Sequence, residues 1–401
     1  MIPAHLMRVA FVDLGNLDYT AITPKQRPLG GMQSATCYLA TALAARGHGV
    51  ALINRTTTPG LYGGVDCAGV GTMSAASLNG FDAVISISPG STKLRHIGVT
   101  RPLILWTGHD VDRPAVESLR EGAERFLWDK YVLVSDWQSA RYSARFNIKP
   151  ERISVLRNAI APAFERSVRG RPYFFVSGRR PVLIYSSTPF RGLDVLLSAF
   201  PRIRARVPRC EATICSSMAV YQAPLELDSY RSLYDLCRAT EGIHYMGSIG
   251  QDALAQTVSE ADIFAYPSTF AETSCIALME AMASGCLVVA SKLGALPETA
   301  AGFGSFCERP ADPRRFAEFY ADFMVQTIHD AYKNPERWAA RIDDQRAFAL
   351  NNYVWSRRAV EWEEMLTAVS RQPVRSKVPP RSEPCPCRSG RSFEHCCGAI
   401  V

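Results

Sequence analysis

Two glutamates, Glu272 and Glu280, stand on either side of the start of a predicted helix. The apolar run 263–266 predicts a strand that ends before Pro267, and the small and apolar residues 274–284 predict the helix that follows the loop. Glu280 would lie roughly 12 Å beyond Glu272 along the helix axis, at about 1.5 Å per residue. A single ligand made of a sugar, a diphosphate and a ribose would span the distance between these two carboxylates.

The amides at the start of that helix are candidate phosphate ligands, because they have no partner within the helix and the helix dipole favours an anion there. They belong to Thr273, Ser274 and Cys275. Two glutamates at this spacing are common by chance, so the interpretation depends on the strand, loop and helix around them. For the Cys275 side chain the alternative is simple packing, and we do not expect a nucleophile.

A second group able to do chemistry lies near residue 390, where Cys385, Cys387, Cys396 and Cys397 fall within thirteen residues. Such a short fragment has no core of its own, and four thiolates are a typical ligand set for a structural zinc ion. The alternative is a redox-active or disulfide-bonded cluster. The other eight cysteines stand singly, mostly in apolar segments, which indicates a reduced protein rather than a disulfide framework.

Three more positions could contribute to a ligand site. Gly30 and Gly31 come directly before a predicted helix over residues 32–46, and a backbone without Cβ atoms would allow a ligand to approach closely. The alternative is an ordinary turn. His109 follows a predicted strand, and ligands of α/β proteins bind at the carboxyl ends of strands. The alternative is a histidine at a helix start, held by Asp110.

Short β-rich runs alternate with helical stretches in two successive arrays, and most of the runs are continuously apolar. Such runs are typical of parallel strands that helices cover on both faces. We therefore expect an α/β protein with two doubly wound, Rossmann-like domains facing a cleft, over residues 1–165 and 166–350. A helix over 351–370, a flexible basic linker over 371–384 and a zinc knuckle over 385–398 would follow. The expected strands are 8–14, 50–54, 83–88, 103–106, 130–135, 182–186, 211–216, 263–266 and 287–290, and the expected helices are 32–46, 136–146 (capped by Asp136), 192–205, 252–260 and 274–284.

The composition excludes several classes of protein. With 401 residues, 47% of them hydrophobic and 21% charged, the chain is neither disordered nor fibrous. No apolar run approaches the ~20 residues of a membrane-spanning helix, and residues 1–12 do not have the pattern of a signal peptide. Residues 371–401 carry +4 of the net charge of +7, so the body is near neutral and we expect no nucleic-acid partner. We expect a cytoplasmic protein and leave peripheral contact with the inner membrane open.

The region around the two glutamates resembles the retaining glycosyltransferases of family 4, which have the two-domain GT-B fold. Their signature is a pair of glutamates with seven residues between them, the second of which begins the sequence Glu-Ala-Met-Ala-x-Gly before an apolar strand. Residues 280–285, Glu-Ala-Met-Ala-Ser-Gly, match this signature. The resemblance covers about residues 7–370, and it implies a first domain on the acceptor side and a second domain that binds the nucleotide-sugar donor.

The resemblance also implies roles for individual residues. Glu280 would hold the ribose hydroxyls, and Glu272 would face the transferred sugar. Gly30 and Gly31 would let the backbone approach the donor diphosphate and the acceptor. His109 would point into the cleft at the donor sugar.

The chain departs from the family pattern at two places in the donor site. Cys275 stands where the family has a glycine, which affects access to the amides. Arg191 takes the place of a lysine, and no arginine occupies the earlier basic position. Arg191 would therefore carry the leaving-group charge largely alone, helped by the hydroxyls of Ser187 and Thr188. The alternative for Arg191 is a loop arginine in solvent. The loop over residues 247–249 would lie near the base.

Residues 384–398 resemble the SEC-C motif, the zinc tail of the bacterial preprotein translocase ATPase. The resemblance implies that the four cysteines of the knuckle bind the zinc ion, with His395 as a reserve ligand and Arg388 in place of a usual glycine. Such tails bind other macromolecules. We therefore expect a docking module on a tether, with a macromolecular partner.

The implied reaction is metal-independent transfer of a sugar, with retention at the anomeric carbon, from a nucleoside-diphosphate sugar to a glycan, lipid-linked or protein acceptor. Catalysis would be mainly electrostatic, because Arg191, the helix amides and the glycine loop would stabilise the departing diphosphate. The alternative is a catalytically inactive adaptor that docks partners through its zinc tail.

Overall fold

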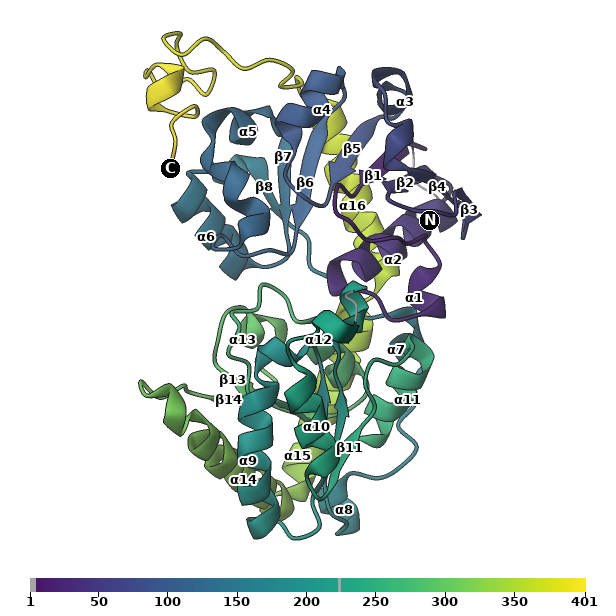
Figure 1. Ribbon diagram of the computed structural model, residues 1–401, viewed down its shortest axis with the longest axis vertical. Coiled ribbons are helices and arrows are strands. Elements are labelled where there is room, and N and C mark those ends of the chain that lie inside the picture. Colours follow the sequence, from purple (N-terminus) through teal and green to yellow (C-terminus); the bar gives the residue numbers. More distant parts are fainter. Residues whose placement is uncertain (1–4, 223–224) are drawn as a thin grey trace. The chain divides into compact units, whose positions relative to one another are not determined.

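The computed structural model describes residues 5–222 and 225–401, and it divides into two compact units (Figure 1). The first unit comprises Met1–Thr23, Met32–Asn158 and Trp355–Val401, and the second comprises Pro24–Gly31 and Ala159–Val354. Residues 1–4, which belong to the segment expected to lack a signal peptide, lie outside the described residues. Across the part of the chain that the structure describes, no helix is long and apolar enough to span a membrane.

The first unit is built on an eight-stranded sheet with the order β3-β4-β2-β1-β5-β6-β7-β8. All neighbouring strands are parallel except β3 and β4, which are antiparallel. Strands β5 and β6 are buried along their whole length, as expected for central strands covered on both faces. The strands are β1 (Arg8–Val12), β2 (Gly49–Asn54), β3 (Gly60–Tyr62), β4 (Val65–Gly69), β5 (Ala83–Ser86), β6 (Leu103–Thr107), β7 (Lys130–Leu133) and β8 (Ile153–Val155).

Helices from both ends of the sequence complete the first unit. Helix α16 (Trp355–Ser370) places Trp362 against Trp106 and Phe11, with ring centroids 5.0 and 6.5 Å apart. The other helices of this unit are α2 (Gly31–Ala45), α3 (Ala75–Asn79), α4 (Ser91–Ile97), α5 (Gly122–Leu127) and α6 (Asp136–Phe146), with 3₁₀ turns at Val70–Thr72, Pro114–Arg120, Pro150–Arg152 and Phe393–His395. The short α1 (Thr23–Gln26) lies where the two units divide the chain.

The second unit contains a six-stranded, wholly parallel sheet with the order β11-β10-β9-β12-β13-β14. Helix α14 packs beside α9, and α15 packs beside α12. The strands are β9 (Val182–Ser186), β10 (Glu211–Cys215), β11 (Ile243–Tyr245), β12 (Ile263–Tyr266), β13 (Leu287–Ser291) and β14 (Ser305–Cys307). The helices are α7 (Pro162–Arg166), α8 (Phe174–Ser177), α9 (Leu193–Arg206), α10 (Arg231–Ala239), α11 (Gln251–Glu260), α12 (Ile276–Ala283), α13 (Leu296–Thr299), α14 (Phe316–Lys333) and α15 (Pro335–Asn352), with 3₁₀ turns at Pro189–Arg191, Met218–Tyr221, Leu225–Leu227 and Pro313–Arg315.

The expected α/β architecture is confirmed, with two corrections at helix starts. Helix α6 is capped by Ser135, whose hydroxyl accepts from the Gln138 amide at 3.0 Å, and not by Asp136. A serine one residue earlier has the extended backbone that a capping position requires. Helix α12 begins at Ile276, two residues later than expected, because Cys275 is still extended and takes the N-cap position.

Candidate active site and candidate metal centre

Glu272 lies in the loop between β12 and α12 and forms an ion pair with Arg191, at the end of the 3₁₀ turn that follows β9. The Glu272 side chain is 3% exposed and that of Arg191 is 23% exposed. The Tyr266 hydroxyl donates to Oε1 of Glu272 at 2.5 Å. Burial by itself would lower the pKa of Arg191, but the Glu272 carboxylate raises that pKa well above its ordinary value. Arg191 is therefore a permanent positive charge held in place by Glu272.

Aromatic rings and a hydroxyl complete the surroundings of this ion pair. The guanidinium carbon of Arg191 lies 4.6 Å from the ring centre of Phe270 and 5.3 Å from that of Phe190. Ser187, one of the two expected hydroxyl donors, has its Oγ 3.1 Å from the Tyr266 hydroxyl. Tyr266 and Phe270 were not identified from the sequence. The position of Tyr266 as the last residue of strand β12 is the signal that could have found it.

The start of helix α12 offers unpaired polar groups. Because the helix begins at Ile276, the amides that lack a carbonyl partner within the helix belong to its first turn, and the Met279 amide is the first to donate to a backbone carbonyl, that of Cys275. The expected residues Thr273, Ser274 and Cys275 form the approach to the helix. The hydroxyl of Ser274 is buried without a hydrogen-bond partner among the described residues, and so is that of Thr188. Buried polar groups are normally paired, so two such hydroxyls would suit a ligand with acceptor oxygens. Burial raises the pKa of Cys275, which keeps it a thiol.

Glu280 lies in the second turn of α12 and is only 5% exposed. Its Oε1 accepts a hydrogen bond from the backbone amide of Ala161 at 3.3 Å. Burial raises the pKa of Glu280 to about 8, although the Ala161 amide lowers it in part. The carboxyl group is therefore mostly protonated at neutral pH, and any group that donates hydrogen bonds to it would favour the charged form.

Gly31 lies against the same helix start. A Cβ atom on Gly31 would be 3.7 Å from Cδ1 of Ile276, which is an ordinary contact. The backbone of Gly31 does not have a positive φ, so the fold itself does not require a glycine there. Gly30, its neighbour, is buried. A requirement for glycine at Gly31 would have to come from a ligand.

His109 belongs to the first unit and lies two residues after the end of β6. Its backbone is held firmly, since its carbonyl accepts from Gln138 at 2.8 Å and from the Tyr142 hydroxyl at 2.9 Å. Its side chain is exposed. Asp110, the alternative partner of this histidine, accepts from Arg141 at 2.7 Å.

The four cysteines of the knuckle come together as expected. In the ranges 5–222 and 225–401, Cys385, Cys387, Cys396 and Cys397 are the one group of three or more potential ligands close enough to hold a metal, with their sulfur atoms within 4.8 Å of one another. Zn–S bonds of about 2.3 Å in a tetrahedron place sulfur atoms roughly 3.8 Å apart, so the donor set and its spacing fit zinc. His395, the reserve ligand, is not part of this group, and its Nδ1 pairs with the Ser392 hydroxyl at 2.8 Å.

The knuckle backbone explains the expected glycine at position 388. Arg388 has a φ of +59°, a left-handed conformation that favours glycine. Hydrogen bonds pre-arrange the thiols: the Ser389 hydroxyl donates to Sγ of Cys396 at 3.1 Å. Burial alone would raise the pKa of Cys387, but hydrogen bonds from Ser389 and the neighbouring cysteines lower it to about 6. A thiolate that forms readily is the state a metal requires.

The fold is shared with enzymes of known structure. A glycosyltransferase from Rickettsia africae superposes with a TM-score of 0.67 at 14% identity, over 92% of this chain and 100% of that one. HepE of Anabaena in complex with UDP-glucose gives a TM-score of 0.64 at 16% identity, over 90% and 100%. The two Rossmann-like units therefore form a GT-B fold, as expected.

Two segments of the chain match known sequence families. Residues 180–324 match the family described as Glycosyl transferases group 1, and residues 381–399 match the SEC-C motif. The chain thus contains a region similar to the group 1 glycosyltransferases and, near residue 390, a SEC-C motif. The matched domain contains Arg191, Glu272 and Glu280.

Three curated relatives share 24–26% of their aligned residues with this chain. A GDP-mannose-dependent alpha-(1-6)-phosphatidylinositol monomannoside mannosyltransferase from Mycolicibacterium smegmatis is 26% identical over 290 residues, which cover 68% of this chain and 72% of the relative. A relative of the same name from Mycobacterium tuberculosis is also 26% identical, and this chain spans 59% of its length. An MMP alpha-(1->4)-mannosyltransferase from Mycolicibacterium hassiacum is 24% identical, over 74% of this chain and 67% of the relative.

Proposed function

We propose that the chain is a retaining, metal-independent transferase that moves a sugar from a nucleoside-diphosphate sugar to a glycan, lipid-linked or protein acceptor. The observation that carries this proposal is the polar groups of two loops, the one after β9 and the one before α12, which the ion pair between Arg191 and Glu272 joins. Arg191 in the turn after β9 is fixed as a cation, and the hydroxyls of Thr188 in the same turn and of Ser274 before α12 are buried without a partner among the described residues. A diphosphate supplies acceptor oxygens for all three and for the helix amides.

In this reaction the bond between the anomeric carbon and the diphosphate oxygen breaks, and its electron pair stays on the diphosphate. The acceptor hydroxyl forms the new bond at the anomeric carbon, and its proton passes to the departing diphosphate. Arg191 and the amides of α12 stabilise the negative charge that develops on the leaving oxygen. Glu272 holds Arg191 in position and faces the transferred sugar, and Tyr266 fixes the orientation of Glu272.

Metal independence is supported by what the carboxylates of the site already do. A catalytic divalent cation requires carboxylates that are free to bind it. Glu272 is engaged by Arg191 and Tyr266, and burial keeps Glu280 mostly protonated at neutral pH. The positive charge that a metal would bring is supplied by Arg191.

The zinc ion belongs to the knuckle, where we propose a structural role for it. Four cysteine ligands leave no position for a substrate. His109, Gly30 and Gly31 remain proposed contacts of the donor and acceptor.

The relatives suggest which donor to test first. Three of those described act, by their names, on GDP-mannose or transfer mannose, and two of them use a phosphatidylinositol mannoside as acceptor. GDP-mannose with a phosphatidylinositol-type lipid is therefore the first pair we propose for this chain. A lipid acceptor would bring the protein into peripheral contact with a membrane.

The test is turnover by the purified full chain with GDP-mannose, UDP-GlcNAc and UDP-glucose, with and without acceptor. We expect hydrolysis or transfer of at least one donor, and a product whose anomeric configuration, read by proton NMR, equals that of the donor. Arg191→Gln should lower kcat by about 10²-fold or more, as removal of a charge-stabilising donor does. Arg202→Gln, an exposed arginine on α9, is the matched control.

Two outcomes would contradict the proposal. An absence of turnover with every nucleotide sugar, by a folded protein, would favour the inactive adaptor. Complete loss of turnover in EDTA, restored by Mn²⁺ while the zinc content stays at one ion per chain, would rule out the metal-independent mechanism.

A further inference from the structure

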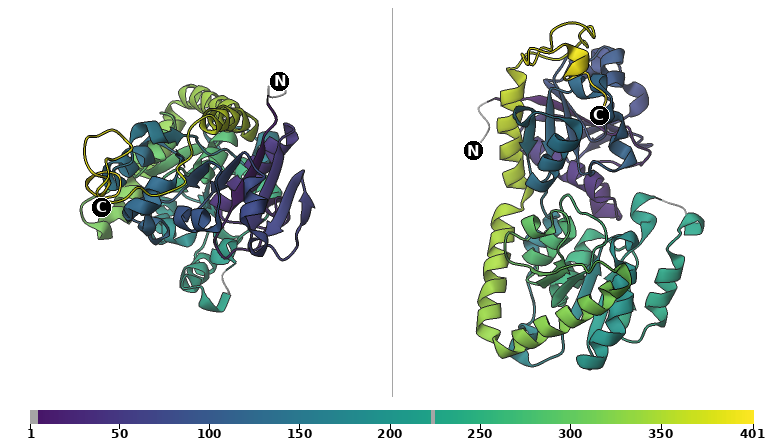
Figure 2. Two further views of the ribbon diagram at one scale, coloured as in Figure 1. Left: turned by 90° about the horizontal axis from the view of Figure 1, so that it is seen from above. Right: turned by 90° about the vertical axis from the view of Figure 1, so that its left-hand side faces the viewer.

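The SEC-C tail packs closely on the first unit (Figures 1 and 2, yellow). The Phe393 ring is buried and meets the Phe126 ring of α5 edge to face, with centroids 5.1 Å apart. These two residues share an apolar cluster with Leu127 and Cys385. The fit extends to the backbone, because a Cβ atom on Gly122 would lie 2.1 Å from the Gly398 carbonyl oxygen.

Polar contacts reinforce this packing at both ends of the tail. The Arg125 guanidinium donates to the carbonyl of Ala399. The amide of Arg375, in the segment expected to be a flexible linker, donates to Asp129 Oδ1 at 2.7 Å. The Arg375 guanidinium also lies 4.9 Å from the ring centre of Phe126. These contacts are those of a docked segment rather than of a free tether.

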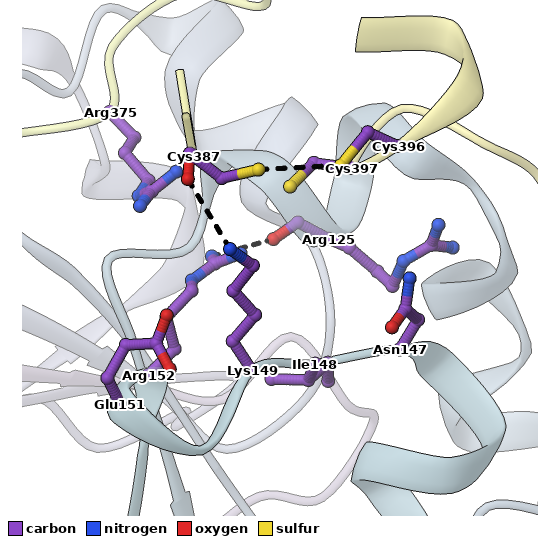
Figure 3. A pocket seen from close by; sticks show the side chains of 10 residues that line it. All are labelled: Arg125, Asn147, Ile148, Lys149, Glu151, Arg152, Arg375, Cys387, Cys396 and Cys397. Carbon is purple, nitrogen blue, oxygen red and sulfur yellow. Dashed lines mark hydrogen bonds between the residues drawn. The ribbon is translucent and has the colours of Figure 1, made fainter. Parts of the chain in front are cut away.

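Positive charges surround the cysteine cluster where it faces the first unit (Figure 3). Three of the four cysteines line a cavity of about 90 Å³ together with Arg125, Lys149, Arg152 and Arg375, and Glu151 is the one acid in its lining. The Lys149 ammonium group approaches the Cys387 carbonyl oxygen at 3.5 Å. Burying cations costs free energy unless a negative charge faces them.

The size and charge of the cavity indicate what this negative charge is. Small-molecule sites measure roughly 300 Å³ or more, so the cavity does not suit a nucleotide or a sugar. A zinc ion with four thiolates carries a net charge of −2. The four cations and Glu151 together carry a net charge of +3. The charge of −2 on the zinc cluster balances most of it, so the cavity does not require a further anion.

We propose that the zinc-loaded tail is a fixed part of the surface of the first unit, and that the metal holds this contact together. With zinc bound, the knuckle keeps its shape around Phe393 and presents a dianion to Arg125, Lys149, Arg152 and Arg375. Without zinc, the fragment loses its fold and the four cations lose their counter-charge. Residues 122–127 and 147–152 are then exposed.

Hydrogen exchange of the full chain, measured before and after zinc removal, tests this proposal. Zinc content is measured first, and one ion per chain is expected. After removal, amides in residues 122–127 and 147–152 should exchange about tenfold faster or more, because their packing partner is lost. Amides of α12, in the second unit, serve as the internal control and should not change. Faster exchange across the whole first unit would also support a fixed tail.

A pair of variants separates charge from packing. Arg375→Gln removes a cation that faces the cluster, and Arg371→Gln makes the same change at an exposed position nearby. Zinc release to a chelator should be about tenfold faster in Arg375→Gln and unchanged in Arg371→Gln. The free energy of one charge-assisted contact corresponds to about this factor in rate.

The inference rests on the proposed zinc ion. The outcomes of these experiments distinguish an error in the zinc assignment from an error in the docking of the tail. A purified chain without bound metal would overturn the zinc assignment itself. Bound zinc whose removal speeds exchange only within residues 385–398 would overturn the docking and restore the tethered module.

Discussion

At the scale of single residues, Glu280 is set apart by a raised pKa. Its carboxyl group is buried in the second unit with the Ala161 amide as its hydrogen-bond donor. The folded protein therefore binds the Glu280 proton more tightly than the unfolded chain does. The contribution of this group to the free energy of unfolding is full at low pH and is lost as the pH rises from about 4.5 to about 8.

This raised pKa predicts that donor binding depends on pH. Ribose hydroxyls donate to a carboxylate, so binding releases the Glu280 proton, and affinity for a nucleotide sugar should rise by up to tenfold per pH unit until about pH 8. Calorimetric titration between pH 6.5 and 9 measures this slope. Glu280→Gln should bind with an affinity that is flat over the same range. Equal slopes in both proteins would disprove the contact between Glu280 and the ribose.

A second variant measures how much the contact between Glu280 and the ribose contributes to the free energy of donor binding. Glu280→Ala should weaken donor binding by roughly 1.5–3 kcal/mol, the usual weight of hydrogen bonds to a charged group. Donor affinity should be measured above pH 8, where the Glu280 carboxyl group of the wild-type protein is charged. An unchanged donor affinity in the folded variant would contradict the assignment.

Gly31 tests whether a ligand, rather than the fold, requires a glycine. An added methyl group would sit 3.7 Å from Ile276, so Gly31→Ala should fold with unchanged or slightly higher stability. If the diphosphate lies against the backbone of Gly31, the added methyl group would occupy the same space as the diphosphate. Donor affinity should then fall by about tenfold or more. Gly170→Ala, where a Cβ atom meets nothing within 4 Å, is the control. Normal donor binding by Gly31→Ala would remove Gly31 from the site.

At the scale of elements, the loop that carries Glu272 is shaped by the turn after strand β13. Gly294 has a φ of +61°, and a Cβ atom there would lie 2.5 Å from the carbonyl oxygen of Glu272. The next amide, that of Ala295, donates to the same oxygen at 2.7 Å. The backbones of the two loops are therefore in direct contact, and this contact fixes the position of Glu272 relative to Arg191.

Gly294→Ala should separate these loops. Left-handed backbone strain alone costs about 1–2 kcal/mol in a residue with a side chain. Gly178→Ala carries that strain without a collision, because nothing lies within 4 Å of the added Cβ atom at φ +70°. Gly294→Ala should lose more stability than this control in chemical denaturation, and it should also lose donor turnover. Similar losses in the two variants would show that the contact with Glu272 has no role.

The sequence predicted elements with a strong local signal and missed those without one. Long apolar runs such as β6 and β12 were placed to within a residue, because burial on both faces leaves a continuous hydrophobic pattern. Five strands were not predicted. Strands β3, β8, β11 and β14 have three residues each, too few for any period, and β4 has five residues with Asp66 inside it and Gly69 at its end. The buried face of α15 includes Gln345, whose amide donates to the Cys286 carbonyl at 2.8 Å, so its apolar stripe is interrupted.

In the candidate site, too, the sequence predicted residues that share one local pattern but not the contacts between distant parts of the chain. Glu272 and Glu280 were found from the sequence because they share one strand, loop and helix. Their partners were not, because Arg191 and Ala161 meet them only in the folded chain, 81 and 119 residues away in sequence. Arg191 itself was found as a candidate, but its ion pair with Glu272 was not expected.

At the scale of the whole molecule, the chain forms the first unit from both of its ends. After the second unit it returns as α16, where Glu363 pairs with Arg46 and with His48 at 2.9 Å. Trp362 fills the space between Phe11 of β1 and Trp106 of β6. The first unit therefore completes its core only when residues 355–370 are present.

The final prediction concerns Trp362→Ala, which should destabilise the first unit by about 3–5 kcal/mol, the usual cost of replacing a buried tryptophan. The side chain is 1% exposed, so the loss is that of core packing. Hydrogen exchange should accelerate in β1 and β6, while β12 and α12 keep their protection, because the second unit has its own core. Glu364→Ala, on the exposed side of the same helix, should change neither unit. If β12 and α12 lose protection together with β1 and β6, the two units unfold as one, and residues 355–370 support the donor site as well as the first unit.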